Sequence, residues 1–163
     1  MTTVLSRTRA LVLGLVVLIL VAVLAVGVAA LARTVNTEHA IAANRDELRS
    51  RAGRILADVF SVDARHWSAD RARARGLVGP EFAESYGAQL HRAPAAGTVA
   101  IVWRPEAVGL VDVALHSGEV LIRVAVTTSG TARPEPTTIR QSVLTRFVKT
   151  GDRWLLDRAE VIG

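Results

Sequence analysis

The feature that most constrains this chain is an uncharged apolar run near its start. Residues 10–32 read ALVLGLVVLILVAVLAVGVAALA and contain no charged side chain, while Arg7, Arg9 and Arg33 flank the run. As a helix rising about 1.5 Å per residue, the run would extend roughly 34 Å, slightly more than the roughly 30 Å hydrocarbon core of a bilayer. It therefore predicts a single membrane-spanning helix.

A cleaved signal peptide is the main alternative for this run. Basic residues precede it, and Ala30-Leu31-Ala32 has the small residues of a cleavage site. However, the run is far longer than the roughly 7–15 apolar residues usual for a signal peptide. We therefore expect an uncleaved signal-anchor.

The orientation of the anchor follows from what comes after it. Basic residues lie on both sides of the run, so charge alone does not favour a cytoplasmic N-terminus. Long segments cross a membrane largely regardless of charge, and residues 33–163 form such a segment. We expect residues 1–9 in the cytoplasm, residues 10–32 in the cell membrane as a single pass, and residues 33–163 on the extracytoplasmic side.

Composition excludes several function classes for the exported part. The chain has 20 Lys plus Arg and 15 Asp plus Glu, and only Arg7 and Arg9 precede residue 33, which leaves an interspersed net charge of +3. Such a charge is no nucleic-acid footprint. Cysteine is absent, and no phosphate-binding loop or nucleophile elbow occurs. The histidines lack metal-ligand spacing, so we expect no metal and no cofactor: His39, His66, His91 and His116.

The exported part begins with predicted helices. Apolar residues on one helical face predict that residues 33–60 form a stalk and first helix. Asn36 is a candidate cap for this helix, and the alternative is a helix that continues from the membrane run without a break. Residues 61–75 read as a second helix. Its alternating arginines predict a solvated face, with acidic lipid headgroups as an alternative contact: Arg71, Arg73 and Arg75.

A third helix is predicted over residues 81–91. Pro80 suits its first position because that position needs no backbone N–H donor. Phe82, Tyr86 and Leu90 are spaced four apart and are expected to face inward.

After Gly97 the periodicity changes from helical to alternating. Arg104-Pro105 predicts a bulge or corner, and Thr150–Arg153 predicts a hairpin turn. Helices followed by an antiparallel meander predict an α+β fold with the helices on one face of the sheet, so that residues 61–163 complete one domain. The predicted strands are 98–103, 107–115, 120–128, 137–149 and 154–162.

These features together resemble a known fold. Three helices, a curved sheet and a closing hairpin with the sequence Gly151-Asp-Arg-Trp-Leu155 look like the cone-shaped NTF2-like fold. With the apolar run, Trp67, Gly97-Thr-Val99 and residues 120–126, nearly the whole chain resembles the actinobacterial Mce-associated membrane proteins. Residues 102–112 depart from that pattern in length and in carrying a proline.

The resemblance implies a non-enzymatic accessory protein. Such a protein would stabilise or assist an Mce-type lipid-import complex of the cell envelope, with the membrane, envelope transport proteins and a lipid as its partners. Anchored NTF2-like domains also resemble the VirB8 family of type IV secretion-channel subunits. The short tail of residues 1–9 argues against that alternative.

A membrane-tethered enzyme is a further alternative, because the cavity of NTF2-like folds hosts catalysis in other proteins. The candidate acid–base group is Asp63 or Asp70 with His66, facing Tyr86 across the cone mouth. We favour a simpler interpretation. It makes Asp63 a helix cap, pairs Asp70 with a nearby arginine and leaves His66 partly exposed, so we expect no enzyme.

Aromatic side chains are the candidate lining of an apolar cavity that could hold a lipid tail or sterol. The commoner alternative for aromatic residues at these spacings is a core between helices and sheet, because ligand sites are few. The candidates are Trp67, Tyr86, Trp103, Phe147 and Trp154.

Overall fold

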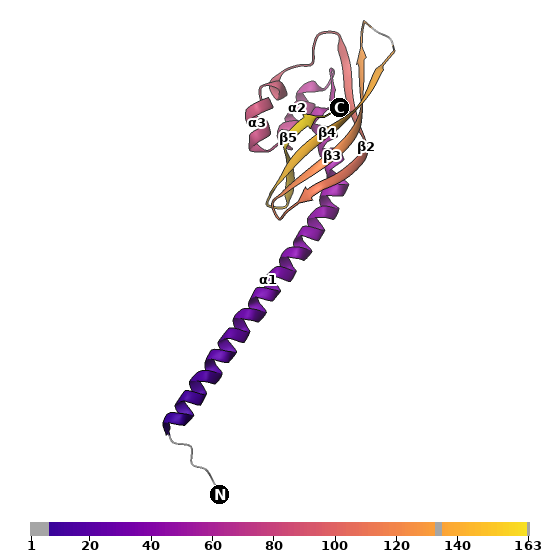
Figure 1. Cartoon of the computed structure of the whole chain (residues 1–163). Helices are drawn as coiled ribbons and strands as arrows, with labels where there is room; N and C mark the ends of the chain where they lie inside the picture. Colours follow the sequence, from indigo (N-terminus) through magenta and orange to yellow (C-terminus); the bar gives the residue numbers. More distant parts are fainter. Residues whose placement is uncertain (1–6, 133–134, 163) are drawn as a thin grey trace. The chain divides into compact units, whose positions relative to one another are not determined.

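The computed structural model describes residues 7–132 and 135–162 and shows an α+β protein (Figure 1). Its internal contacts define two units, Met1–Ala40 and Ile41–Gly163. Helix α1, Arg7–Phe60, contributes residues to both. The other elements are β1 Val62–Asp63, α2 Trp67–Arg75, α3 Pro80–Tyr86, the 3₁₀ helix η1 Gln89–His91, β2 Thr98–Val113, β3 Ser117–Gly130, β4 Thr137–Thr150 and β5 Arg153–Val161.

The first unit includes the run predicted to span a membrane, residues 10–32. Most side chains of this run lie outside the described residues, and those described, such as Leu18 and Leu24, are exposed. Within the described part of the chain, no helix meets the length and apolarity that a membrane span requires. Helix α1 continues through residues 33–52, which contain no glycine or proline, so the cap at Asn36 is wrong and the alternative of a continuous helix is confirmed.

The second unit is built on a curved antiparallel sheet of five strands in the order β1-β2-β3-β4-β5. Each strand pairs with its neighbour in sequence, so the predicted meander is confirmed. Strand β3 shows the predicted alternation: Val120, Ile122 and Val124 are buried, while Leu121 and Arg123 on the other face are exposed. The predicted α+β class is thereby confirmed.

Residues 98–113 form one strand where the sequence predicts two. The register of β2 against β3 shifts between Pro105 and Ala107, so the proline produces a bulge and not a break. The predicted turn between β4 and β5 is confirmed, with Gly151 at φ +59 in the left-handed region.

The predicted helix over residues 61–75 begins too early. Val62 pairs with Ile101 of β2, so this segment starts as strand β1. Helix α2 begins only at Trp67. Val62 is 2% exposed, so burial of its apolar side chain supports the strand pairing over a longer helix.

The predicted helix over residues 81–91 is divided into α3 and η1. Gly87 follows the last residue of α3, and η1 resumes at Gln89. Pro80 occupies the first turn of α3 as predicted. Phe82 and Leu90 face inward as predicted, whereas Tyr86 is 40% exposed.

One face of α1 packs into the core of the second unit. Leu48 and Leu56 of α1 are fully buried, and each such side chain contributes roughly 1.5–3 kcal/mol when buried. Gly118 of β3 allows this close packing, since a Cβ there would lie 2.5 Å from Leu48 Cδ2. The buried core joins α1, the short helices and the sheet, and its members include Leu48, Ala52, Leu56, Val59, Phe82, Val120, Ile122, Val124, Phe147 and Leu156.

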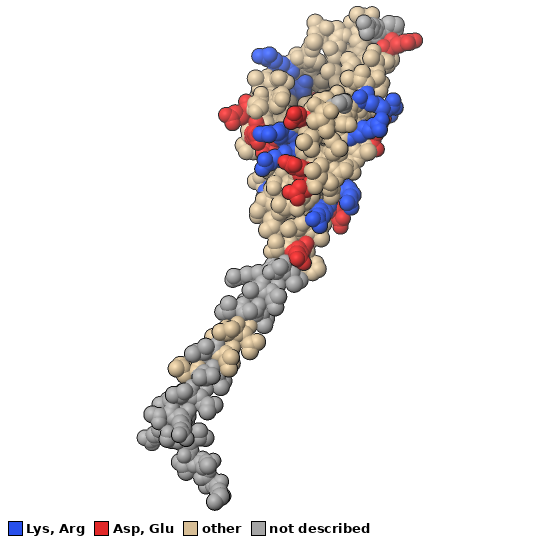
Figure 2. Space-filling model, viewed as in Figure 1, with Lys and Arg blue, Asp and Glu red and all other residues tan. Residues whose placement is uncertain are grey.

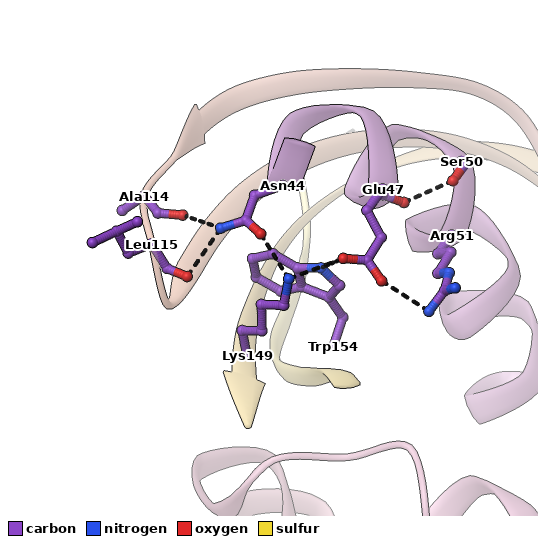
Figure 3. A network of polar contacts seen from close by, with 8 residues as sticks. All are labelled: Asn44, Glu47, Ser50, Arg51, Ala114, Leu115, Lys149 and Trp154. Carbon is purple, nitrogen blue, oxygen red and sulfur yellow. Dashed lines mark hydrogen bonds and ion pairs between the residues drawn. The ribbon is translucent and has the colours of Figure 1, made fainter. Parts of the chain in front are cut away.

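A polar network fixes α1 to the end of the sheet (Figure 3). Asn44 Nδ2 donates hydrogen bonds to the carbonyl oxygens of Ala114 and Leu115, both at 3.0 Å. Lys149 Nζ donates to Asn44 Oδ1 at 2.7 Å and to Glu47 Oε2 at 3.0 Å. The network therefore joins α1 to the β2–β3 hairpin and to β4.

Glu47 is the most shared member of this polar network. Besides Lys149, its carboxylate accepts a hydrogen bond from Trp154 Nε1 at 3.2 Å and pairs with Arg51 at 2.9 Å. Lys149 Nζ also lies 5.4 Å from the centre of the Trp154 ring. The Lys149 hydrogen bond is the main reason that the pKa of Glu47 lies below its ordinary value, although partial burial opposes the shift.

We expect Glu47→Gln to lower the free energy of unfolding by about 1–3 kcal/mol at neutral pH, because a charged hydrogen-bonding group is lost. The native pKa lies below the unfolded one, so ionised Glu47 stabilises the fold above about pH 4.5. This contribution disappears as the pH falls through the lowered native pKa, so the variant should lose part of the acid dependence of stability.

Urea unfolding of the full chain, followed by circular dichroism across this pH range, measures both effects. The matched control is Glu119→Gln, an exposed residue of β3. Identical pH profiles for Glu47→Gln and the unsubstituted protein would contradict the role of Glu47.

Candidate functional site

Four aromatic rings form a continuous chain in the second unit. Phe60, the last residue of α1, stacks on Trp103 of β2 with ring centroids 4.6 Å apart. Phe60 also meets Phe82 of α3 edge-on at 5.8 Å, and Phe82 lies 5.0 Å from Tyr86 one turn later. Such pairs contribute roughly 0.5–1.5 kcal/mol each beyond the area they bury. The rings therefore hold α3 against β2 and the end of α1.

Two cavities adjoin this chain of rings. The first has a volume of about 620 Å³ and extends along β5, and the second has a volume of about 380 Å³ and extends along α2 and η1. Both volumes fall within the roughly 300–1,000 Å³ of small-ligand sites. We call the two cavities together the aromatic cleft. Its shared lining residues are Phe60, Phe82, Tyr86, Trp103 and Gln141.

The α3 wall of the cleft is fixed to β5. The Gly79 N–H donates to the Leu156 carbonyl at 2.8 Å, and the Glu81 N–H donates to Asp157 Oδ1 at 3.1 Å. Gly79 occupies the cap position of α3 and has no side chain that could accept a hydrogen bond. The buried side chain of Asp157 in β5 therefore accepts the hydrogen bond from the N-terminus of α3 in its place. A Cβ on Gly79 would lie only 2.4 Å from Asp157 Oδ1.

Charges at the rim of the first cavity are already paired. Arg158 Nε donates to Glu81 Oε1 at 2.8 Å, and the bond to this carboxylate raises the pKa of Arg158. Asp157 is occupied by the α3 N-terminus. With the Glu160 carboxylate added, this rim is more acidic than basic and offers little attraction to an anion.

The second cavity has the opposite electrostatic character. Arg71 of α2 lines it, and its described lining contains no acidic residue. Arg71 Nε is buried and has no hydrogen-bond partner within the described structure. Burial lowers the pKa of the Arg71 guanidinium, and nearby Asp70 opposes that shift only partly. Asp70 itself accepts a hydrogen bond from Arg73 at 2.5 Å, as the simpler interpretation predicts, and another from the Asp63 N–H at 2.9 Å.

The aromatic residues proposed from the sequence divide between cleft and core. Tyr86 and Trp103 line the cleft. Phe147 is fully buried, and buried Trp154 donates its indole N–H to Glu47, so both belong to the core. Trp67, at the start of α2, is half-buried and lines neither cavity.

Asp63 and Asp70 lie together beside β1, but neither of these candidate acid–base residues faces Tyr86. Asp63 lies in β1 and does not cap a helix, because its segment pairs with β2. The side chain and the backbone N–H of Arg65 lower the pKa of Asp63 to about 2, which makes it a weak base at neutral pH. His66 is exposed, as the simpler interpretation predicts. Tyr86 lines the cleft, whereas Asp63 lines a separate hollow beside β1.

Phe60 and Arg71 are among the cleft residues that the sequence does not identify. The helical pattern places Phe60 on the apolar face of the first helix without showing that it ends there. It places Arg71 on a solvated face, which is wrong because η1 packs against α2 and the Nε atom is buried. The spacing of the arginines was the available signal, because Arg71 and Arg73 are two residues apart on a short helix and must face different directions. The arginines therefore cannot all lie on one solvated face.

Comparison with protein-family models and with curated proteins finds no match for this chain. Throughout the described ranges, no group of three or more His, Cys, Asp or Glu residues could hold a metal ion. Figure 2 shows acidic and basic side chains intermixed on the visible face, with no large region of one sign. The aromatic cleft is therefore the feature on which a functional proposal can be based.

We expect Gly79→Ala to destabilise the protein by about 1–3 kcal/mol, because the added methyl group overpacks a filled site. The new Cβ would collide with the carboxylate that binds the N-terminus of α3 and would lie 3.1 Å from Val148 Cγ2. Thermal unfolding of the full chain tests this. Gly109→Ala is the matched control, since a Cβ there meets nothing closer than 3.8 Å. Equal melting temperatures for the two variants would refute the close packing of Gly79.

We expect Arg71→Met to raise the free energy of unfolding by about 1 kcal/mol, because a buried donor without a partner is replaced by an apolar chain of similar length. Urea unfolding measures the change. Arg73→Met, which removes an exposed ion pair, should alter stability by less than about 1 kcal/mol in the other direction. A destabilised Arg71→Met variant would mean that the guanidinium stabilises the ligand-free fold.

Proposed function

We propose that this chain is a non-enzymatic, membrane-anchored accessory protein of the cell envelope that stabilises or assists an Mce-type lipid-import complex. The aromatic cleft carries the proposal. It is a recess of ligand-binding size lined by four aromatic rings, in a domain that follows an uncharged run of membrane-spanning length. The cleft would hold a lipid, while the outer surface of the domain would contact protein partners.

The anchor in this proposal is the run of residues 10–32. Its lack of any charged side chain supports insertion as one helix, and it makes a conduction path within the span unfavourable. Residues 1–9 would remain in the cytoplasm, and the unit Ile41–Gly163 would lie on the extracytoplasmic side. The span would then act as a tether.

We propose further that the unit Ile41–Gly163 is an NTF2-like cone. In its support, four long antiparallel strands follow three helices in sequence, and the last two strands are joined by the Gly151 turn. The cleft between α3 and the sheet corresponds to the cone's cavity. A non-enzymatic role is supported by the separation of Asp63 and His66 from the cleft-lining Tyr86.

Cysteine labelling tests the anchor and its orientation, because the chain contains no cysteine. Ala132→Cys, in the exposed segment after β3, should react with a membrane-impermeant maleimide in intact cells. Thr3→Cys should react only after lysis. Reaction of Thr3→Cys in intact cells, or recovery of the unsubstituted chain in the alkaline-soluble fraction, would contradict the proposed topology.

Affinity purification from the native host in a mild detergent tests the assembly. We expect a C-terminally tagged chain to recover Mce-type transport components, and an unrelated single-pass protein with the same tag to recover none. Recovery of secretion-channel components in their place would support the VirB8-like alternative. Recovery of neither set would count against an accessory role in transport.

A further inference from the structure

Arg71 differs from the other described arginines of the second unit. Several of them form ion pairs or donate to carbonyl oxygens, as Arg158 does to Glu81 and Arg75 does to Leu90. Those without such a described partner are exposed to water: Arg45, Arg54, Arg92, Arg104 and Arg146. Within the described part of this unit, Arg71 alone combines a water-shielded guanidinium nitrogen with the lack of a partner.

The surroundings of Arg71 define what would complement it. The described lining of the second cavity contains no carboxylate, and its remaining polar side chains are neutral. Leaving a buried charged donor unpaired is costly, so an anion entering the cavity would gain a hydrogen bond that the empty site lacks. The apolar part of the lining is Phe60, Phe82, Leu90, Ile101, Trp103, Val126 and Ile139, with Tyr86 beside them.

The first cavity determines how such a molecule would be oriented. Its rim carries three carboxylates, Glu81, Asp157 and Glu160, against the single cation Arg158, which is already paired with Glu81, so the rim would disfavour an anionic head. Its apolar lining, including Val143 and Val161, joins the second cavity through the shared aromatic rings. A head at Arg71 and an apolar tail toward β5 is therefore the arrangement with complementary charge.

We propose that the aromatic cleft binds a long-chain carboxylate, with the carboxylate on the Arg71 guanidinium and the tail between α3 and the sheet. A planar carboxylate matches the planar guanidinium with two parallel hydrogen bonds, and a single cation balances its single charge. A phosphate monoester carries more charge than this cavity neutralises. The proposal rests on the lipid-binding role of the cleft but not on the import complex.

Photolabelling tests this proposal on the full chain in phosphatidylcholine nanodiscs. The probes are a diazirine-bearing palmitic acid and its methyl ester, and labelled peptides are mapped by mass spectrometry. We expect the acid to label peptides that line the cleft. Arg71→Gln should reduce that labelling about tenfold, the loss expected for one charge-assisted hydrogen bond. Arg71→Lys should retain part of it.

Two controls separate the charge from the fold. Arg146→Gln removes an equal charge from an exposed arginine of β4 that lines neither cavity, and it should label like the unsubstituted chain. The ester should label the cleft weakly and to the same extent in Arg71→Gln, which shows that the variant keeps the cleft intact.

Equal labelling by acid and ester, or no effect of Arg71→Gln, would overturn the carboxylate proposal while leaving a lipid-binding cleft. A phosphorylated lipid analogue that competes better than palmitate would also overturn it. Labelling confined to peptides outside the cleft, or cross-linking of a second copy there in place of the acid, would overturn both the carboxylate and the lipid-binding role. None of these labelling results would change the expected recovery of transport components in the affinity purification.

Discussion

The structure depends on the burial of one face of α1 against the inner face of the sheet. Val120 and Ile122 of β3 would be exposed to water without this cover, and both are completely buried beneath it together with Leu48 and Leu56. Hydrophobic burial of this kind is the dominant favourable term in folding. Because α1 ends at Phe60, the same packing also positions the first ring of the aromatic chain. The packing of α1 on the sheet therefore contributes to both the core and the aromatic cleft.

The second unit treats its buried charges in two different ways. Glu47 and Lys149 each have several partners, and their contacts join α1 to the sheet. Arg71 Nε, in contrast, has no hydrogen-bond partner in the described structure. Asp70 is its neighbour in sequence, but the Asp70 carboxylate is bonded to Arg73. Natural proteins accept such local costs at functional sites and compensate for them elsewhere. The Glu47 network thus joins α1 to the sheet, whereas Arg71 of α2 is the charged group to which the proposal assigns ligand recognition.

Features that depend on residues close together in the sequence are predicted correctly, whereas those that depend on distant segments are not. The alternation in β3 and Pro80 at the start of α3 are local signals, and both are confirmed because a buried sheet face and a helix first turn impose them. Strand β1 depends on pairing with β2, far along the chain, so no local pattern distinguishes it from a helix. The cleft is predicted only through Tyr86 and Trp103. The burial of Arg71 is not predicted, because it depends on the packing of η1 against α2 and the α2 sequence does not indicate where η1 lies.

Lys149 is the only lysine of the chain. Its amine is committed to Asn44 and Glu47 and lies over the Trp154 ring, and its side chain is 18% exposed. An acylating reagent requires the free amine, so it can react with Lys149 only when these contacts open. The rate of acylation at this one position therefore reports the local opening equilibrium between α1 and β4. Lys149 is thus an intrinsic chemical probe for the stability of the contact between α1 and β4.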